Sequence, residues 1–394
     1  MPVDFLYGLF QLPFWGYALV VFAMIQLLFL AITLFLHREQ SHGALVLHPV
    51  LRHIFRFWLW YSSGTVTKQW VAVHRRHHVY ADKEGDPHSP VVFGLRRVVM
   101  EGYELYAVAA RDPKILDNYG RGTPDDWIER NLYTRYPFLG IVLFSITQLV
   151  LFGVPAILMV AIHLAAQPFC AAGIINGVGH HFGYRSFETE SAATNILPCG
   201  QLIAGEELHN NHHAFPRSAR FSVQPWEFDI GWMWICIFRT FGLVRVTKVA
   251  PERRVAQVAS STVDDSTLQA LFSNRMHVLR DYAHRVIRPV CRQLQKDSPS
   301  GSLPVGISRL LVRHPMLLPR DALVARDAVL EQHEVLRAVM EFRDRLQALW
   351  TGASANQTRA VAQLRHWCAQ AEESGIRALR DFAESVRRYA PSPA

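Results

Sequence analysis

The sequence FWGYALVVFAMIQLLFLAITLFLHREQSH, residues 14–42, joins a long uncharged stretch to the first of several histidine clusters. Residues 14–36 contain no Asp, Glu, Lys or Arg. At 1.5 Å per helical residue, this stretch can cross a hydrocarbon core of roughly 30 Å. A secretory signal peptide would instead show a basic segment before the apolar run and a small-residue cleavage site after it. The stretch therefore predicts a transmembrane helix.

A second uncharged stretch, residues 137–179, is about twice as long as one span. Gly153, Val154 and Pro155 lie near its middle, where a tight turn would join two helices. Residues 45–66 and 230–243 are apolar but carry basic residues, which is typical of helices in the membrane interface. We expect a mainly α integral membrane protein with about three transmembrane helices, a fourth being left open.

The basic residues predict how the chain is oriented in the membrane. Short loops rich in Lys and Arg remain in the cytoplasm. The segment before residue 14 carries only Asp4 as a charged residue. The basic residues between the first apolar stretch and the second include Arg38, Arg52, Arg56, Lys68, Arg75, Arg76, Arg96 and Arg97. The histidine clusters that follow the first apolar stretch are therefore expected to face the cytoplasm.

Three histidine boxes supply eight imidazoles: HREQSH, HRRHH and HNNHH. Neutral imidazole is a common ligand of iron, zinc, copper and nickel. In each HxxHH box the histidines are spaced i, i+3 and i+4, so that on a helix they share one stripe and are expected to meet a common point. His37 and His42 are five residues apart, which predicts that the first helix ends near His37 and the chain bends back. The eight residues are His37, His42, His74, His77, His78, His209, His212 and His213.

Eight imidazoles exceed the needs of one metal ion and indicate two ions with four or five ligands each. His180, at the end of the second apolar stretch, is a ninth candidate, with Asn176 one turn earlier and His181 as a substitute. His88 is interpreted as an interfacial or supporting residue. Spacing alone leaves zinc as well as iron possible. Carboxylates that could hold the second nitrogen of the ligands are Asp82, Asp86, Glu39 and Glu206.

Composition changes near Ala250, after which the chain loses its long apolar runs. This change predicts two domains: a membrane-embedded domain over residues 1–250 and a soluble helical extension over residues 251–394, whose role the sequence does not reveal. Apolar residues from Val329 to Trp350 recur at roughly heptad spacing, which predicts a helical bundle or coiled coil. The arginines of the extension are interleaved with Asp and Glu, so no nucleic-acid partner is expected.

The ordered motifs HREQSH, HRRHH with DPHSP, NGVGH and GEELHNNHHAFP closely resemble the membrane fatty acid desaturases, in particular the acyl-CoA Δ9 (stearoyl-CoA type) branch and its bacterial members. The likeness covers about residues 10–245. It implies two iron ions, with Asn176 holding a metal-bound water. It implies no catalytic residues beyond the metal ligands. The implied ligands are His37, His42, His74, His77, His78, His180, His209, His212 and His213.

The resemblance implies an enzyme that uses O2 to introduce a cis double bond into a long-chain saturated acyl-CoA, at Δ9. It implies the bacterial inner membrane, with membrane lipids around the enzyme and the active site facing the cytoplasm. Electrons would come from an external NAD(P)H-dependent reductase or a ferredoxin, since the chain shows no flavin, haem or iron–sulfur motif. Trp70 resembles a residue of the acyl tunnel, and Lys68 is a candidate contact for a CoA phosphate.

Several alternatives stay open at this point. The basic CoA contacts of animal members do not align well here, which leaves an acyl-lipid (phospholipid) substrate possible. A related di-iron fatty acid or alkane hydroxylase uses similar boxes but inserts oxygen. A histidine-rich metal transporter belongs to a different class, but transporters place ligands near the bilayer midplane, whereas these boxes lie outside the apolar stretches.

Overall fold

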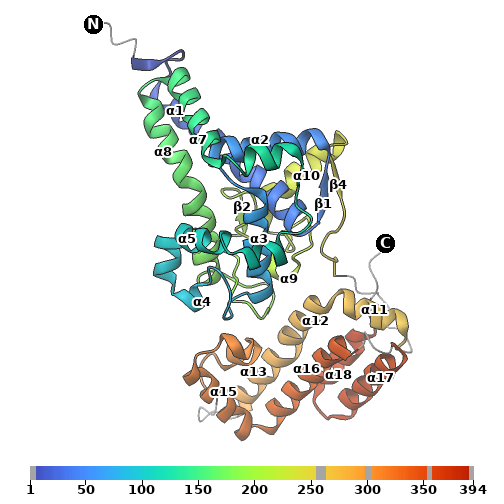
Figure 1. Cartoon of the computed structure of the whole chain (residues 1–394). Coiled ribbons are helices and arrows are strands. Elements are labelled where there is room, and N and C mark those ends of the chain that lie inside the picture. The colour runs from blue at the N-terminus through green and yellow to red at the C-terminus, as the bar shows by residue number, and fades with distance from the viewer. Residues whose placement is uncertain (1–5, 254–262, 298–302, 353–356, 390–394) are drawn as a thin grey trace. The chain divides into compact units, whose positions relative to one another are not determined.

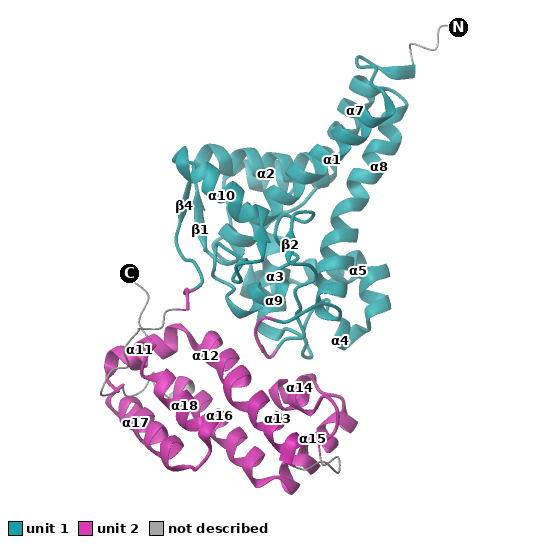
Figure 2. Ribbon diagram, turned by 180° about the vertical axis from the view of Figure 1, so that it is seen from behind, with its two compact units in different colours: residues 1–185, 191–250 teal, residues 186–190, 251–394 magenta. Residues whose placement is uncertain are grey.

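The computed structural model describes residues 6–253, 263–297, 303–352 and 357–389. The chain divides into two compact units, coloured separately in Figure 2. Unit 1 contains residues 1–185 and 191–250, and unit 2 contains residues 186–190 and 251–394. Unit 1 carries all three histidine boxes.

Three apolar helices form the elongated part of unit 1 (Figure 1). Helix α1 (Phe14–Ala31) continues without a break into the π-helix η2 (Ile32–Ser41). Helix α7 (Pro137–Phe152) is followed by α8 (Pro155–Gln167), which continues as the π-helix η4 (Pro168–Gly177). The predicted hairpin over residues 137–179 is therefore confirmed as a pair of packed helices.

The turn between α7 and α8 requires glycine. Gly153 has a φ of +64°, which L-residues with side chains rarely adopt. A Cβ on Gly153 would also lie 2.0 Å from the carbonyl oxygen of Leu6. The backbone of the N-terminal segment thus packs directly against this turn.

Among the described residues, two continuous helices are long and apolar enough to cross a membrane, Phe14–Ser41 and Pro155–His180. Helix α7 has 16 residues, fewer than the roughly 20 that a perpendicular span needs. The amphipathic helices α2 (Pro49–Ser63) and α10 (Ile230–Thr240) occupy the segments expected to be interfacial. On α2, the side chains of Val50, Ile54 and Phe57 are exposed along one face.

The remaining elements of unit 1 surround the histidine boxes. Strand β1 (Leu45–Leu47) pairs antiparallel with β4 (Val244–Val246), which ties the first box to the end of the unit. Strands β2 (Cys199–Gly200) and β3 (Phe228–Asp229) form a short parallel pair. The other helices are α3 (Thr67–Tyr80), α4 (Pro90–Phe93), α5 (Leu95–Ala110), α6 (Pro113–Tyr119), η3 (Glu129–Tyr133), η5 (Val178–His180) and α9 (His209–Ala214).

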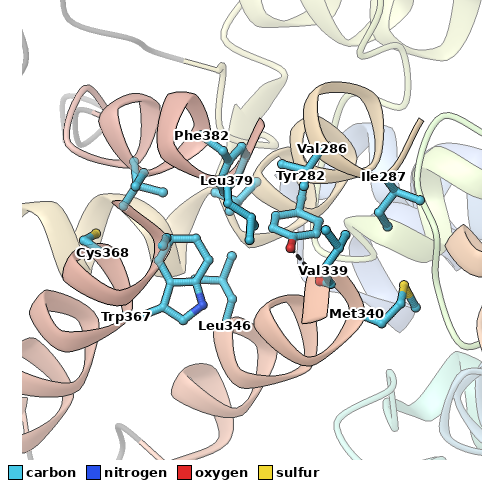
Figure 3. Close-up of a cluster of buried hydrophobic side chains, with 14 of the residues drawn as sticks. Tyr282, Val286, Ile287, Val339, Met340, Leu346, Trp367, Cys368, Leu379 and Phe382 are labelled. Carbon is cyan, nitrogen blue, oxygen red and sulfur yellow. Dashed lines mark hydrogen bonds between the residues drawn. The ribbon is translucent and has the colours of Figure 1, made fainter. Parts of the chain in front are cut away.

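Unit 2 is a helical bundle with its own core. The apolar residues expected at heptad spacing lie in this core, including the buried Leu336, Val339 and Leu346. Tyr282 is buried among them and donates a hydrogen bond of 2.6 Å to the carbonyl oxygen of Val339 (Figure 3). Its helices are α11 (Asp265–Ser273), α12 (Arg275–Tyr282), η6 (Ala283–Ile287), α13 (Arg288–Asp297), α14 (Ile307–Val312), η7 (Pro315–Leu317), α15 (Arg320–Gln332), α16 (Glu334–Gly352), α17 (Gln357–Glu373) and α18 (Arg377–Val386).

Candidate metal centre

Nine histidines of unit 1 converge in two adjoining groups. Within each group, one ring nitrogen from every histidine lies within 4.8 Å of all the others. The rings of His78 and His213 stack with centroids 4.6 Å apart and bring the two groups together. The first group is His37, His42, His74, His78 and His212, and the second is His77, His180, His209 and His213.

The two HxxHH boxes are each divided between the groups. His74 and His78 enter the first group, while His77 enters the second. The expectation that each box presents three imidazoles to one common point is therefore wrong. Successive side chains on a helix differ by about 100° in direction, so that neighbours such as His77 and His78 turn toward different centres. Each centre is built from several boxes.

Residues 37–41 of the first box lie on a π-helix and not on a bend. Helix η2 runs past His37 to Ser41, which corrects the expectation that the helix ends near His37. The N–H of His42 donates to the carbonyl oxygen of His37 at 3.2 Å, the i→i+5 bond of a π-helix. Because this wider turn closes over five residues, it places His37 and His42 one turn apart, with ring centroids separated by 5.1 Å.

Buried carboxylates form hydrogen bonds with Nδ1 of three of the histidines. Each carboxylate accepts a hydrogen bond from Nδ1, which leaves Nε2 as the free lone pair. Glu39 does not take this role: it pairs with Arg52 at 2.6 Å and accepts the N–H of Leu47. The three pairs are His37 with Glu206 at 2.7 Å, His77 with Asp86 at 2.9 Å, and His180 with Asp82 at 2.8 Å.

The Nε2 atoms face one another at close range. The Nε2 of His37 lies 3.0 Å from that of His212, and the Nε2 of His180 lies 3.0 Å from that of His209. The Nδ1 proton of His37 and that of His180 are donated to carboxylates. The unprotonated Nε2 of each ring therefore points its lone pair toward the Nε2 of the opposing histidine. Clustered acceptors of this kind fit a cation placed among them. The all-imidazole donor set suits transition metals such as iron or zinc.

The surroundings keep most of these histidines in the neutral form that binds metal. Burial, reinforced by neighbouring histidines, lowers the pKa of six of them. His77 differs: burial opposes its protonation, but the Asp86 carboxylate outweighs burial and raises the pKa of His77. The six are His42, His74, His78, His209, His212 and His213.

These pKa shifts predict that the metal-free protein is sensitive to acid. A buried histidine with a lowered pKa stays neutral in the folded state, whereas in the unfolded chain it takes up a proton near pH 6.5. The free energy of unfolding should therefore decrease as the pH falls below about 6.5, by up to about 1.4 kcal/mol per pH unit for each histidine. His77, with the opposite shift, offsets part of this loss. Measuring the denaturant midpoint of the metal-free protein at several pH values between about 7 and 5 tests the prediction. A midpoint that does not change with pH would contradict it.

A cavity of about 550 Å³ leads to both histidine groups. Its lining includes His37 and His74 of the first group and His209 of the second. Trp70 lines it and stacks on His74, with ring centroids 5.0 Å apart and an angle of 15°. Asn176 lines the same cavity. Apolar wall residues come from α1, η2, α5, α7, α8 and η4 and include Phe29, Ile32, Tyr106, Ile141, Leu164 and Ile175.

The basic residues near the boxes are largely engaged by the protein itself. Lys68 is exposed, packs against Gly120 and lies outside the described lining of the cavity. Arg75 donates to four backbone carbonyl oxygens, including those of Ser41 and Tyr119. Arg75 therefore braces the first box, a role that the sequence pattern does not reveal.

His88 lies closer to the candidate metal ligands than its sequence context indicates. It is buried, its ring centroid lies 4.7 Å from that of His77, and it lines the cavity. Together with His77 and Asp86 it forms a third group of potential ligands. His181, by contrast, is exposed and packs on Phe182, outside both histidine groups.

Comparison with known proteins supports this picture. The family described as "Fatty acid desaturase" matches residues 12–226, more than half of the chain. The sn-1 stearoyl-lipid 9-desaturase of Synechocystis is 31% identical over 242 residues, 58% of this chain and 71% of that protein. An acyl-CoA 5-desaturase of Anemone leveillei is 30% identical over 226 residues, covering 56% of this chain and 68% of that protein. The delta-9 acyl-lipid desaturase 2 of Arabidopsis thaliana is 28% identical over 256 residues, 62% of this chain and 80% of that protein.

A second family, described as "Transposase", matches residues 270–392. This match lies within unit 2 and covers less than half of the chain. The histidine groups, the cavity and the desaturase match all lie in unit 1. The chain belongs to the fatty acid desaturase family and is an oxidoreductase of lipid metabolism.

Proposed function

We propose that the chain is an O2-dependent fatty acyl desaturase that introduces a cis double bond at Δ9 of a long-chain saturated acyl group. The observation that carries this proposal is the largely apolar cavity that ends on both histidine groups. A transporter site would need ligands near the bilayer midplane and has no use for an acyl-sized cavity.

Two iron ions are the metals that the family resemblance implies. The five histidines of the first group would hold one ion and the four of the second group would hold the other, with Asn176 positioning a water beside them. Once bound, the iron pair would activate O2, which is the oxidant for the removal of two hydrogens from an unactivated methylene pair. Asp82, Asp86 and Glu206 keep Nδ1 of their histidines protonated, so that Nε2 stays available as a ligand.

The cavity walls would hold the acyl chain so that one pair of carbons meets the histidine groups. Trp70, stacked on His74, forms the wall where the chain would pass the first group. The apolar side chains along the rest of the cavity exclude water, which protects a strong oxidant from side reactions. The distance from the cavity mouth to the histidines would then determine the position of the double bond.

The carrier of the acyl chain is proposed to be CoA, as the sequence motifs imply. A phospholipid is a second candidate, which one observation favours: Arg111 is the one Arg or Lys in the described lining, fewer cations than a CoA moiety with several phosphates would engage. Incubating the purified enzyme and a reductase with isotope-labelled stearoyl-CoA or with labelled phosphatidylcholine, each under conditions that block acyl exchange, separates these two carriers.

We further propose that the protein lies in the bacterial inner membrane with the histidine groups facing the cytoplasm. The basic residues between the first helix and α7 support this orientation. Electrons would arrive from an external NAD(P)H-dependent reductase or a ferredoxin.

Expression in a host with a suitable reductase tests the reaction. Mass spectrometry of the host lipids should show new monounsaturated chains, with the double bond located by fragmentation. Hydroxylated chains without any alkene would instead assign the enzyme to the di-iron hydroxylases. Unchanged lipids, with the protein present and loaded with iron, would exclude both reactions.

Asp86→Asn is expected to weaken iron binding about 10–100-fold, because the carboxylate that orients His77 and raises its basicity is replaced by a neutral amide. Iron retained after dialysis against a graded chelator series measures this loss. Asp125→Asn is the matched control, since Asp125 is exposed and pairs with Arg130. Equal iron retention in the two variants would contradict the supporting role of Asp86.

A further inference from the structure

The positive charge of the chain is concentrated in its C-terminal part. Residues 251–394 contain 20 Arg and one Lys against 15 Asp and Glu, whereas residues 1–250 contain 20 basic and 18 acidic residues. Most of the net charge of +8 therefore belongs to residues 251–394. The desaturase match, the histidine groups and the cavity all lie in unit 1 and give no reason for this excess.

Part of the excess forms a stripe along one continuous helix, α12–η6–α13. Arg280, His284, Arg288 and Arg292 recur every four residues, and Lys296 continues the spacing. Arg288 donates to Nδ1 of His284 at 3.3 Å. We call these five residues the arginine stripe.

Three arginines of the stripe act electrostatically on His284. Partial burial lowers the pKa of His284, and the charges of Arg288, Arg280 and Arg292 lower it further. Asp281 is the acidic residue that opposes this effect, but its carboxylate is already engaged by Arg253 at 2.8 Å and by the hydroxyl of Tyr389 at 2.6 Å.

The stripe lacks the partners that other arginines of unit 2 have. Arg326, Arg343 and Arg387 each form an ion pair with an acidic residue. Within the described part of the chain, none of the four cations of the stripe forms an ion pair. Like charges four residues apart on a helix are unfavourable by themselves, so that an external polyanion is the natural counterpart of this face.

We propose that the arginine stripe docks on anionic phospholipid headgroups of the bilayer that holds unit 1. Unit 2 belongs to the same polypeptide as the two candidate membrane helices, and a connection of only 14 residues, 251–264, precedes α11. Such a tether makes binding to the surface of that bilayer an intramolecular event. Basic clusters close to a membrane helix are attracted to acidic lipids, and salt screens this attraction. The proposal rests on the membrane location of unit 1 and not on its reaction.

The test uses the full chain in nanodiscs. The exposed Gln295 is replaced by Cys for attachment of a donor dye, in a Cys199→Ser background that removes an exposed native thiol. The acceptor dye is carried by a lipid headgroup. Energy transfer should increase when phosphatidylglycerol is mixed into phosphatidylcholine, and the increase should be lost at about 1 M salt.

The variant Arg280→Gln/Arg288→Gln/Arg292→Gln should lose the response to phosphatidylglycerol. The control Arg326→Gln/Arg377→Gln/Arg388→Gln removes the same charge from arginines that already have acidic partners, and should keep the response. Thermal unfolding of both variants shows whether unit 2 remains folded. Product formation by the same samples keeps a failure of the desaturase proposal separate from a failure of this one.

Nucleic acid is the rival polyanion, given the transposase match over residues 270–392. Binding of labelled duplex DNA that depends on the stripe, in the absence of any response to phosphatidylglycerol, would overturn the proposal in favour of nucleic acid. An equal response in the stripe variant and the control would overturn it as well, since general charge and not this face would then be responsible.

Discussion

His212→Ala should abolish desaturation and leave the protein with about one iron ion in place of two. The Nε2 of His212 lies 3.0 Å from that of His37 and 2.8 Å from that of His78, so that it sits at the centre of the first group. Removing it deletes a nitrogen donor and opens a buried gap beside Phe221, whose ring centroid is 4.9 Å away. Iron analysis of the purified protein and lipid mass spectrometry of the expressing host measure the two effects.

His181→Ala is the matched control for this change. His181 follows a proposed ligand directly, but its side chain is exposed and lies outside both histidine groups. Iron content and product should stay at the level of the unaltered chain. If His212→Ala retained both iron ions, or if His181→Ala lost one, the division of the histidines into groups of five and four would be wrong.

Sequence motifs predicted which histidines come together, but not how they are distributed. HxxHH spacing places three imidazoles along one helical stripe. The number of histidines indicated two metal ions, but nothing in the spacing reveals that each box is divided between them. The cross-box arrangement arises in the fold, where α3, α9 and η2 meet and present His74, His212 and His37 to one another. The π-helix that aligns His37 with His42 also escaped prediction, since it depends on how the helix packs over its last ten residues.

Charged residues near the boxes show the same limit of sequence reasoning. The bias of Arg and Lys toward one side predicts orientation, yet it treats each cation as exposed. Arg38 and Arg56 are buried in the structure, and Arg56 pairs with Asp126 and Glu129. The long apolar runs and the Gly153 turn were predictable because length and composition decide them locally. Partners of buried arginines come from distant parts of the chain.

Replacing Arg38 is also expected to have a large effect on stability, because this residue connects the first box to the core. Its side chain and that of Asp229 are fully buried and 3.0 Å apart, and its guanidinium lies 3.9 Å from the centre of the Phe221 ring. Arg38→Met leaves the Asp229 carboxylate buried without its cation, which should lower the free energy of unfolding by about 3–5 kcal/mol. Thermal and denaturant unfolding of the detergent-solubilised protein measure this loss.

The double variant Arg38→Met/Asp229→Asn separates the lost ion pair from lost packing. Asp229 now caps α10 by accepting the N–H of Trp232, and the amide oxygen introduced by Asp229→Asn would still be able to accept that bond while the unpaired charge is removed. We therefore expect the double variant to recover part of the stability that Arg38→Met loses. Arg130→Met, at an exposed pair with Asp125, should leave unfolding unchanged. A double variant no more stable than Arg38→Met would show that the arginine acts through its backbone contacts to Ala219 and its packing on Phe221, and not through the ion pair.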